Sequence, residues 1–96
     1  MSNSIKLSIQ QIVFDFESLI RAQEKVNTLK MTGSLYESDC IEYKNSMVDM
    51  AERYLPNYMQ HIHSRFFSDE TDELEKAGIL ATVLYENFKE IFYQLI

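Results

Sequence analysis

Three side chains with the potential for chemistry, Cys40, His61 and His63, lie in the middle of this 96-residue chain. A zinc site needs three or four nitrogen, sulfur or carboxylate ligands around one ion. On a helix, residues two apart point in nearly opposite directions, and no Asp, Glu or Cys lies three or four residues from either histidine. We therefore predict no metal site and no bound cofactor.

Cys40 is the only cysteine, so no disulfide can form within the chain. A cysteine nucleophile needs a base close to its sulfur, and the two histidines lie on a different segment, at a distance from Cys40 that the sequence does not give. We interpret Cys40 as a buried structural thiol. The two glycines, Gly33 and Gly78, are too few for a glycine-rich phosphate-binding loop. The chain is therefore predicted not to be an enzyme.

The elements that position these side chains are predicted to be helices, because apolar residues recur at steps of 3 and 4. The pattern is most regular over 71–95, which we expect to be the central packing element, capped by Asp69 or Thr71. Its stripe comprises Leu74, Ala77, Ala81, Leu84, Phe88, Ile91 and Leu95. The small residues at 77, 78 and 81 would let a neighbouring backbone approach closely.

Three further helices are expected before it. The first, about 4–31, has Asn3 or Ser4 as a cap and Gly33 in a left-handed terminal turn. Its stripe comprises Ile5, Ile9, Ile12, Phe16, Leu19, Gln23 and Val26. The second, about 35–54, starts at the capping box of Ser34 and Glu37. Its softer face comprises Tyr36, Cys40, Tyr43, Met47, Met50, Ala51 and Tyr54. Pro56 either begins a third helix, about 56–67, or bends the second.

Short connections between helices favour antiparallel neighbours. We therefore predict an all-α fold, a compact antiparallel bundle of three or four helices that forms a single domain over 1–96. Few glycines and prolines and no sustained period-2 alternation argue against a β fold.

The formal net charge is −6, and the acids concentrate in 32–56 and 68–96. An acidic surface repels phosphates, so we expect no nucleic-acid partner, and no long apolar run indicates a membrane span. The acidic residues of 69–75 could contact a basic partner, but we favour a solvated first turn of a helix. No signal-peptide pattern is present, so we expect a cytoplasmic protein, with signal-independent export left open.

Some apolar residues project away from the predicted core stripes. On the last helix these are Ile79, Val83 and Tyr93, which lie among Glu75, Glu86 and Glu90. We take Ile79, Val83, Glu86 and Glu90 as the first candidate surface for a protein partner. On the first helix, Leu7 and Phe14 form the second candidate surface.

The leading hypothesis is a small acidic protein-interaction module that binds a protein partner through a helix face. Adaptors, secretion or assembly chaperones, inhibitors and immunity-type proteins act in this way. Self-association as a homodimer is an alternative use of the same surfaces. The alternative function is a helical transcription regulator or nucleic-acid-binding domain that uses the segment from Pro56 to Phe67, where Arg65 is the single formal cation.

Overall fold

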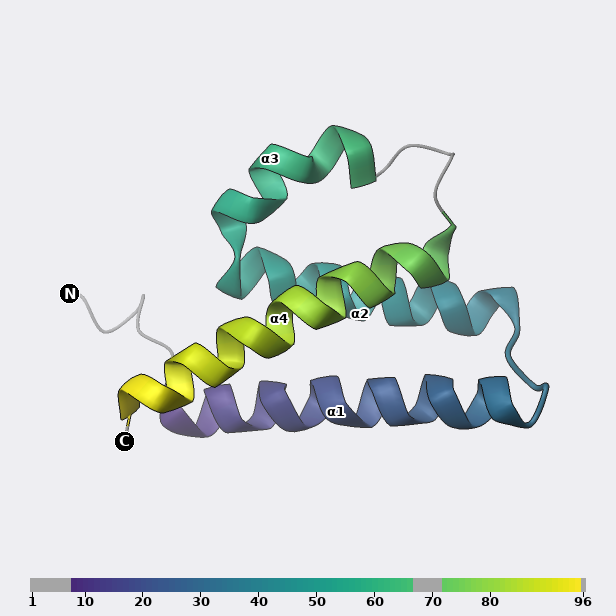
Figure 1. The fold of residues 1–96 in the computed structure, drawn as a ribbon, viewed down its shortest axis with the longest axis horizontal. Helices are drawn as coiled ribbons and strands as arrows, with labels where there is room; N and C mark the ends of the chain where they lie inside the picture. Colours follow the sequence, from purple (N-terminus) through teal and green to yellow (C-terminus); the bar gives the residue numbers. More distant parts are fainter. Residues whose placement is uncertain (1–7, 67–71, 96) are drawn as a thin grey trace.

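The computed structural model describes residues 8–66 and 72–95, with side chains described for all of these except 62–66. The described chain folds into α1 (Ile9–Met31), α2 (Glu37–Tyr54), α3 (Pro56–Phe66) and α4 (Glu73–Leu95), and no strand occurs within these ranges (Figure 1). The all-α bundle predicted from the apolar periodicity is therefore confirmed.

The helices are arranged around a central pair, α2 and α4. α1 runs along one side of this pair and α3 lies on the other, while α4 crosses α2 obliquely (Figure 1). α2 packs against α1, α3 and α4, whereas α4 packs chiefly against α2 and also against α1. The expectation that the last helix alone is central is therefore incomplete, because α2 has the wider set of neighbours.

The core lies mainly between α1, α2 and α4, with Met59 contributed by α3, and most of it comes from the predicted stripes. Its buried apolar residues are Ile12, Leu19, Val26, Tyr43, Met47, Met50, Ala51, Met59, Ala77, Leu80, Ala81, Leu84 and Phe88. Three members of the predicted stripes are exposed instead: Ile9, Tyr36 and Leu95. Each lies at or next to a helix end.

α1 begins later than predicted. Ser8 has an extended backbone, and its Oγ accepts a hydrogen bond of 3.0 Å from the backbone N–H of Gln11, so Ser8 is the cap. Such a side-chain acceptor satisfies one of the N–H groups left free at a helix start. The apolar stripe that starts at Ile5 extended the prediction too far. The predicted caps, Asn3 and Ser4, lie outside the described residues.

The other two caps also differ from the prediction. At α2, the Asp39 carboxylate accepts a 3.0 Å hydrogen bond from the Tyr36 N–H, so the helix starts two residues after the predicted position. At α4, Asp72 Oδ1 accepts a 2.7 Å hydrogen bond from the Glu75 N–H. Several Ser, Thr and Asp residues lie near each helix start and are suitable N-caps, and the sequence alone does not decide which of them begins the helix. The predicted α4 caps, Asp69 and Thr71, lie outside the described residues.

Pro56 separates two helices. α2 ends at Tyr54, Leu55 is non-helical, and Pro56 is the first residue of α3. A proline lacks the N–H that this first position does not need, and it disfavours helical geometry in the residue before it. The bent single helix, the other option left open by the sequence, is therefore excluded.

Gly33 ends α1 as predicted. Its φ of 70° lies in the left-handed region. The N–H of Ser34 donates to the carbonyl of Leu29 at 2.8 Å, and the N–H of Gly33 donates to that of Lys30 at 3.3 Å. This pair of bonds is a Schellman motif, which satisfies two of the carbonyls left free at the helix end.

Alanine at the two glycines is expected to have opposite effects on stability. Gly78 lies inside α4, and a methyl group there would meet no atom of another described element within 4 Å. The other two small residues of the predicted pattern, Ala77 and Ala81, are buried. Gly78→Ala should raise the free energy of unfolding by about 1 kcal/mol through helix propensity. Gly33→Ala should lower it by about 1–2 kcal/mol, because the side chain disfavours positive φ. Urea unfolding of both variants measures the difference, and equal signs would contradict it.

Candidate functional site

Four predicted partner-binding residues share one face of α4. Ile79, Val83, Glu86 and Glu90 follow one another at steps of 4, 3 and 4, so their side chains project from the same side of the helix. Ile79 is 43% exposed, and both glutamates are exposed. Val83 is half-buried, so it is less available than the sequence had indicated.

The second predicted surface belongs to a different helix. Phe14 projects from α1 and is 56% exposed, which agrees with its predicted position away from the Ile12 stripe. Leu7, its predicted companion, lies outside the described residues. The sequence-predicted residues are therefore divided between two helix faces, and the one on α4 is described in full.

Two more residues extend the surface on α4. Glu75 is four residues before Ile79, and Tyr93 is three residues after Glu90, so both continue the same line. Tyr93 is 75% exposed and Glu75 is exposed. We call the line formed by Glu75, Ile79, Val83, Glu86, Glu90 and Tyr93 the α4 outer face. Along this line the apolar pair Ile79 and Val83 lies between Glu75 on one side and Glu86 and Glu90 on the other, and Tyr93 follows the two glutamates.

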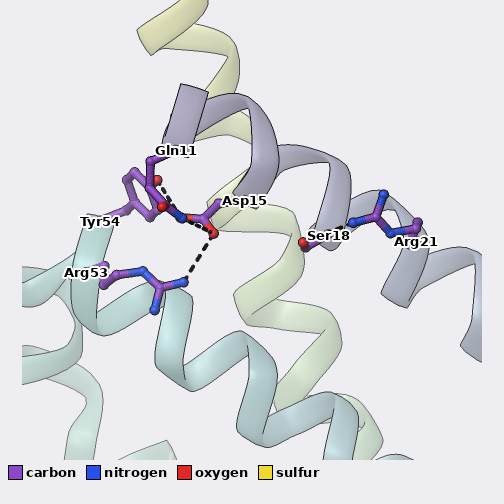
Figure 2. Close-up of polar contacts among 6 residues, drawn as sticks. All are labelled: Gln11, Asp15, Ser18, Arg21, Arg53 and Tyr54. Atoms are coloured by element: carbon purple, nitrogen blue, oxygen red, sulfur yellow. Dashed lines mark hydrogen bonds and ion pairs between the residues drawn. The ribbon is translucent and has the colours of Figure 1, made fainter. Parts of the chain in front are cut away.

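A buried carboxylate that the sequence did not single out joins α1 to α2. Asp15 is only 2% exposed. Its Oδ2 accepts a 2.7 Å hydrogen bond from the Tyr54 hydroxyl, and its Oδ1 accepts one of 3.1 Å from Gln11 Nε2 (Figure 2). Arg53 Nη2 lies 3.4 Å from the same Oδ1 and neutralises the charge. A buried carboxylate is tolerated only when it is paired and hydrogen-bonded in this way.

Tyr54 therefore acts as a donor fixed in its protonated form. Burial, and then the hydrogen bond and charge of Asp15, raise the pKa of Tyr54 well above its ordinary value, and Arg53 offsets part of this effect. The ring of Tyr54 also packs edge-on against Phe88 of α4 at a centroid distance of 4.8 Å. One side chain thus connects the Asp15 cluster to the apolar core.

Aromatic contacts fix α1 against α4. Phe16 lies 5.9 Å from the ring of Tyr85, 5.6 Å from that of Phe88 and 5.4 Å from that of Phe92, measured between centroids. Such pairs contribute about 0.5–1.5 kcal/mol each beyond the area they bury. Asp15 and Phe16 therefore attach α1 to two different helices through adjacent positions. Both carboxylate oxygens of Asp15 already accept hydrogen bonds from side chains of this protein, so we interpret the cluster as structural.

Cys40 has the environment of a structural thiol. It is half-buried near the start of α2. Burial, and then the negative charges of Asp39 and Asp72, raise the pKa of the Cys40 thiol above its ordinary value. A nucleophilic cysteine needs the opposite shift, because the thiolate is the reactive form. These surroundings favour the neutral thiol.

Lys44, Glu73 and Lys76 form an ion-pair cluster between α2 and α4. Glu73 Oε2 lies 3.0 Å from Lys44 Nζ, and Glu73 Oε1 lies 3.5 Å from the buried Lys76 Nζ. The hydrogen bond from Lys44, followed by the charges of both lysines, lowers the pKa of Glu73, with burial opposing. This stabilisation is present above the pKa of Glu73 in the unfolded chain and is lost as pH falls through the lower folded value.

Glu73→Gln is therefore expected to make stability less sensitive to acid. Between about pH 7 and pH 3, wild-type protein should lose more of its free energy of unfolding than the variant. Only the wild-type protein has the Glu73 carboxylate, which takes up a proton in this range and then no longer pairs with the lysines. Urea midpoints at several pH values measure the two slopes. Glu75→Gln is the control, since Glu75 is also in the first turn of α4 and makes none of these ion pairs. Parallel curves for wild type and Glu73→Gln would contradict the prediction.

The histidines are not gathered into a ligand set in the part of the chain that the structure describes. His61 is exposed on α3, and the side chain of His63 lies outside the described part. Within that part, no three His, Cys, Asp or Glu side chains are close enough to hold a metal ion. The same ranges contain no helix with the length and apolar content needed to cross a bilayer.

No protein-family model, no curated protein and no solved structure matches this chain. Its function is therefore inferred from its own surface and chemistry.

Proposed function

We propose that the protein is a small acidic interaction module that binds a protein partner through the α4 outer face. The observation that carries the proposal is that α4 has apolar residues on two sides. One side contributes Ala77, Leu80, Ala81, Leu84 and Phe88 to the core. The other presents Ile79 and Tyr93 to solvent in a line with the half-buried Val83.

A partner would gain free energy by covering this stripe. Fully burying a large apolar side chain contributes about 1.5–3 kcal/mol, and Ile79 and Tyr93 still have much of their area to bury. Single exposed apolar residues are ordinary, whereas an aligned set bordered by charge is typical of helix-face recognition. The glutamates would steer a partner and fix its register more than they would add affinity. Adaptors, chaperones of secretion or assembly, inhibitors and immunity-type proteins use surfaces of this kind.

The test is a comparison of two isoleucines on different helices. Ile79 is 43% exposed on α4 and Ile41 is 39% exposed on α2, so Ile79→Gln and Ile41→Gln remove similar apolar areas without changing charge. Tagged wild type and both variants are used to capture proteins from extracts of the source cells. A partner of the α4 outer face should bind wild type and Ile41→Gln and be lost with Ile79→Gln.

Two measurements make the outcome decisive. Circular dichroism must show that Ile79→Gln keeps the wild-type helix content, so that a loss of binding reflects the surface and not the fold. Light scattering over a dilution series gives the molar mass, and a dimer that Ile79→Gln dissociates would identify a second copy as the partner. Identical captured sets and identical masses for all three proteins would refute the proposal.

A further inference from the structure

We propose that the partner presents a basic amphipathic helix to the α4 outer face. This inference rests on the function proposed above and names the class of partner. The helix would place apolar residues over Ile79, Val83 and Tyr93. Its lysines or arginines would lie against Glu75 at one end and against Glu86 and Glu90 toward the other.

The shape of the surface favours a helix as its occupant. The six residues of the α4 outer face step by 4, 4, 3, 4 and 3, so they form one stripe along the helix. From Glu75 to Tyr93 the stripe spans about 27 Å, at about 1.5 Å per residue. Mixed steps of 3 and 4 are the spacing at which one helix packs lengthwise against a second helix.

The charge of the surface favours a basic occupant. Glu75, Glu86 and Glu90 are exposed, and the ion pair described on this face joins Glu86 to Lys89. The Lys89 ammonium is already shared between Glu86, at 3.9 Å, and the Tyr85 ring, 5.7 Å from its centroid. The last turn of α4 has no basic residue, so the negative end of the helix dipole adds to the two glutamates near it.

The same charges disfavour the other occupants. A second copy of this chain would place three glutamates on each side of the contact, and bringing two surfaces of like charge together costs free energy. A phosphate backbone or an anionic lipid surface is repelled for the same reason. An exposed tyrosine at the acidic end, Tyr93, suits a cationic side chain, which can lie over its ring.

The probes are three synthetic helical peptides of about 18 residues. The first has a leucine-rich face flanked by lysine and arginine, the second has the same apolar face flanked by glutamate, and the third has the basic composition with its apolar positions scrambled. Each is titrated into the isotope-labelled full chain, and the methyl resonances of Ile79 and Val83 are followed by NMR. The first peptide alone should shift these resonances in a saturable manner.

A pair of charge-reversed variants tests the role of the glutamates. Glu86→Lys combined with Glu90→Lys should weaken binding of the basic peptide at least tenfold. Glu17→Lys combined with Glu24→Lys is the matched control, because it makes the same change of charge at two exposed positions of α1. The control should bind the basic peptide within about twofold of wild type. The small expected loss comes from the change in net charge, which weakens the long-range attraction of any basic peptide.

The outcomes separate this inference from the proposed function. Equal binding of the glutamate-flanked peptide would overturn the basic partner and leave the apolar surface intact. Equal weakening by the two pairs of variants would show unspecific attraction and overturn the inference. Absence of any methyl shift with all three peptides would also overturn it, whereas the capture experiment with Ile79→Gln decides the proposed function independently.

Discussion

Leu84→Asp is expected to unfold the protein or leave it close to its unfolding threshold. Leu84 lies at the middle of α4 and is fully buried in the core between α1, α2 and α4. An unpaired carboxylate there costs several kcal/mol, and a domain of this size has a total free energy of unfolding of about 5–15 kcal/mol. Urea unfolding followed by circular dichroism measures the loss.

The control for this prediction is Leu95→Asp on the same helix. The apolar periodicity places Leu84 and Leu95 on one stripe, yet Leu95 is 50% exposed. Leu95→Asp should therefore change the free energy of unfolding by no more than about 1 kcal/mol, chiefly through the unfavourable position of an acid at a helix C-terminus. Equal losses for the two variants would contradict the structure, in which Leu84 is buried and Leu95 is half exposed.

Tyr54→Phe is expected to lower the free energy of unfolding by about 1.5–3 kcal/mol, the range for a hydrogen bond to a charged group. The substitution leaves Asp15 buried without its 2.7 Å donor, while the ring can keep its contact with Phe88. Tyr93→Phe removes the same hydroxyl from an exposed tyrosine and should change stability by about 0.5 kcal/mol or less. Thermal or urea unfolding of both variants measures the contrast.

Removing both partners should cost less than removing one. Asp15→Leu combined with Tyr54→Phe eliminates the buried charge together with its donor, and Arg53 is exposed enough to turn toward water. The double variant is therefore expected to lie within about 1 kcal/mol of wild type, because apolar replacements of a buried polar pair are often neutral. The losses of free energy of unfolding in Asp15→Leu and Tyr54→Phe are measured separately for comparison. If the loss in the double variant equals the sum of these two, Asp15 and Tyr54 act independently.

The apolar periodicity predicted the helices and most of the core, because burial of a helix depends mainly on which residues share a face. Leu19, Met47 and Phe88 were all placed correctly. The helix starts were less accurate, since Ser8 and Asp72 compete with nearby residues of equal capping ability. Whether Pro56 begins a helix or bends one depends on the packing of both segments, so sequence alone left it open.

The Asp15 cluster shows what local sequence does not contain. Asp15 lies three residues after Ile12 and four before Leu19, so its position on the core face was visible in the spacing. Its partners Arg53 and Tyr54 are 38 and 39 residues away, and only the pairing of α1 with α2 brings them together. For the α4 outer face, sequence identified the line of residues, whereas the partial burial of Val83 required the tertiary structure.

The turn at Gly33 determines whether α1 packs on the α2–α4 pair of the same chain. A single left-handed residue reverses the chain between α1 and α2 and returns α1 to its own α2–α4 pair. If that position adopted a right-handed helical conformation, α1 would extend away from its own core and expose the faces of Asp15 and Phe16. Another copy carries the same complementary surfaces, and such an exchange of identical elements is domain swapping. Because glycine adopts positive φ without the side-chain penalty of other residues, Gly33 permits the turn that closes α1 onto its own α2–α4 pair.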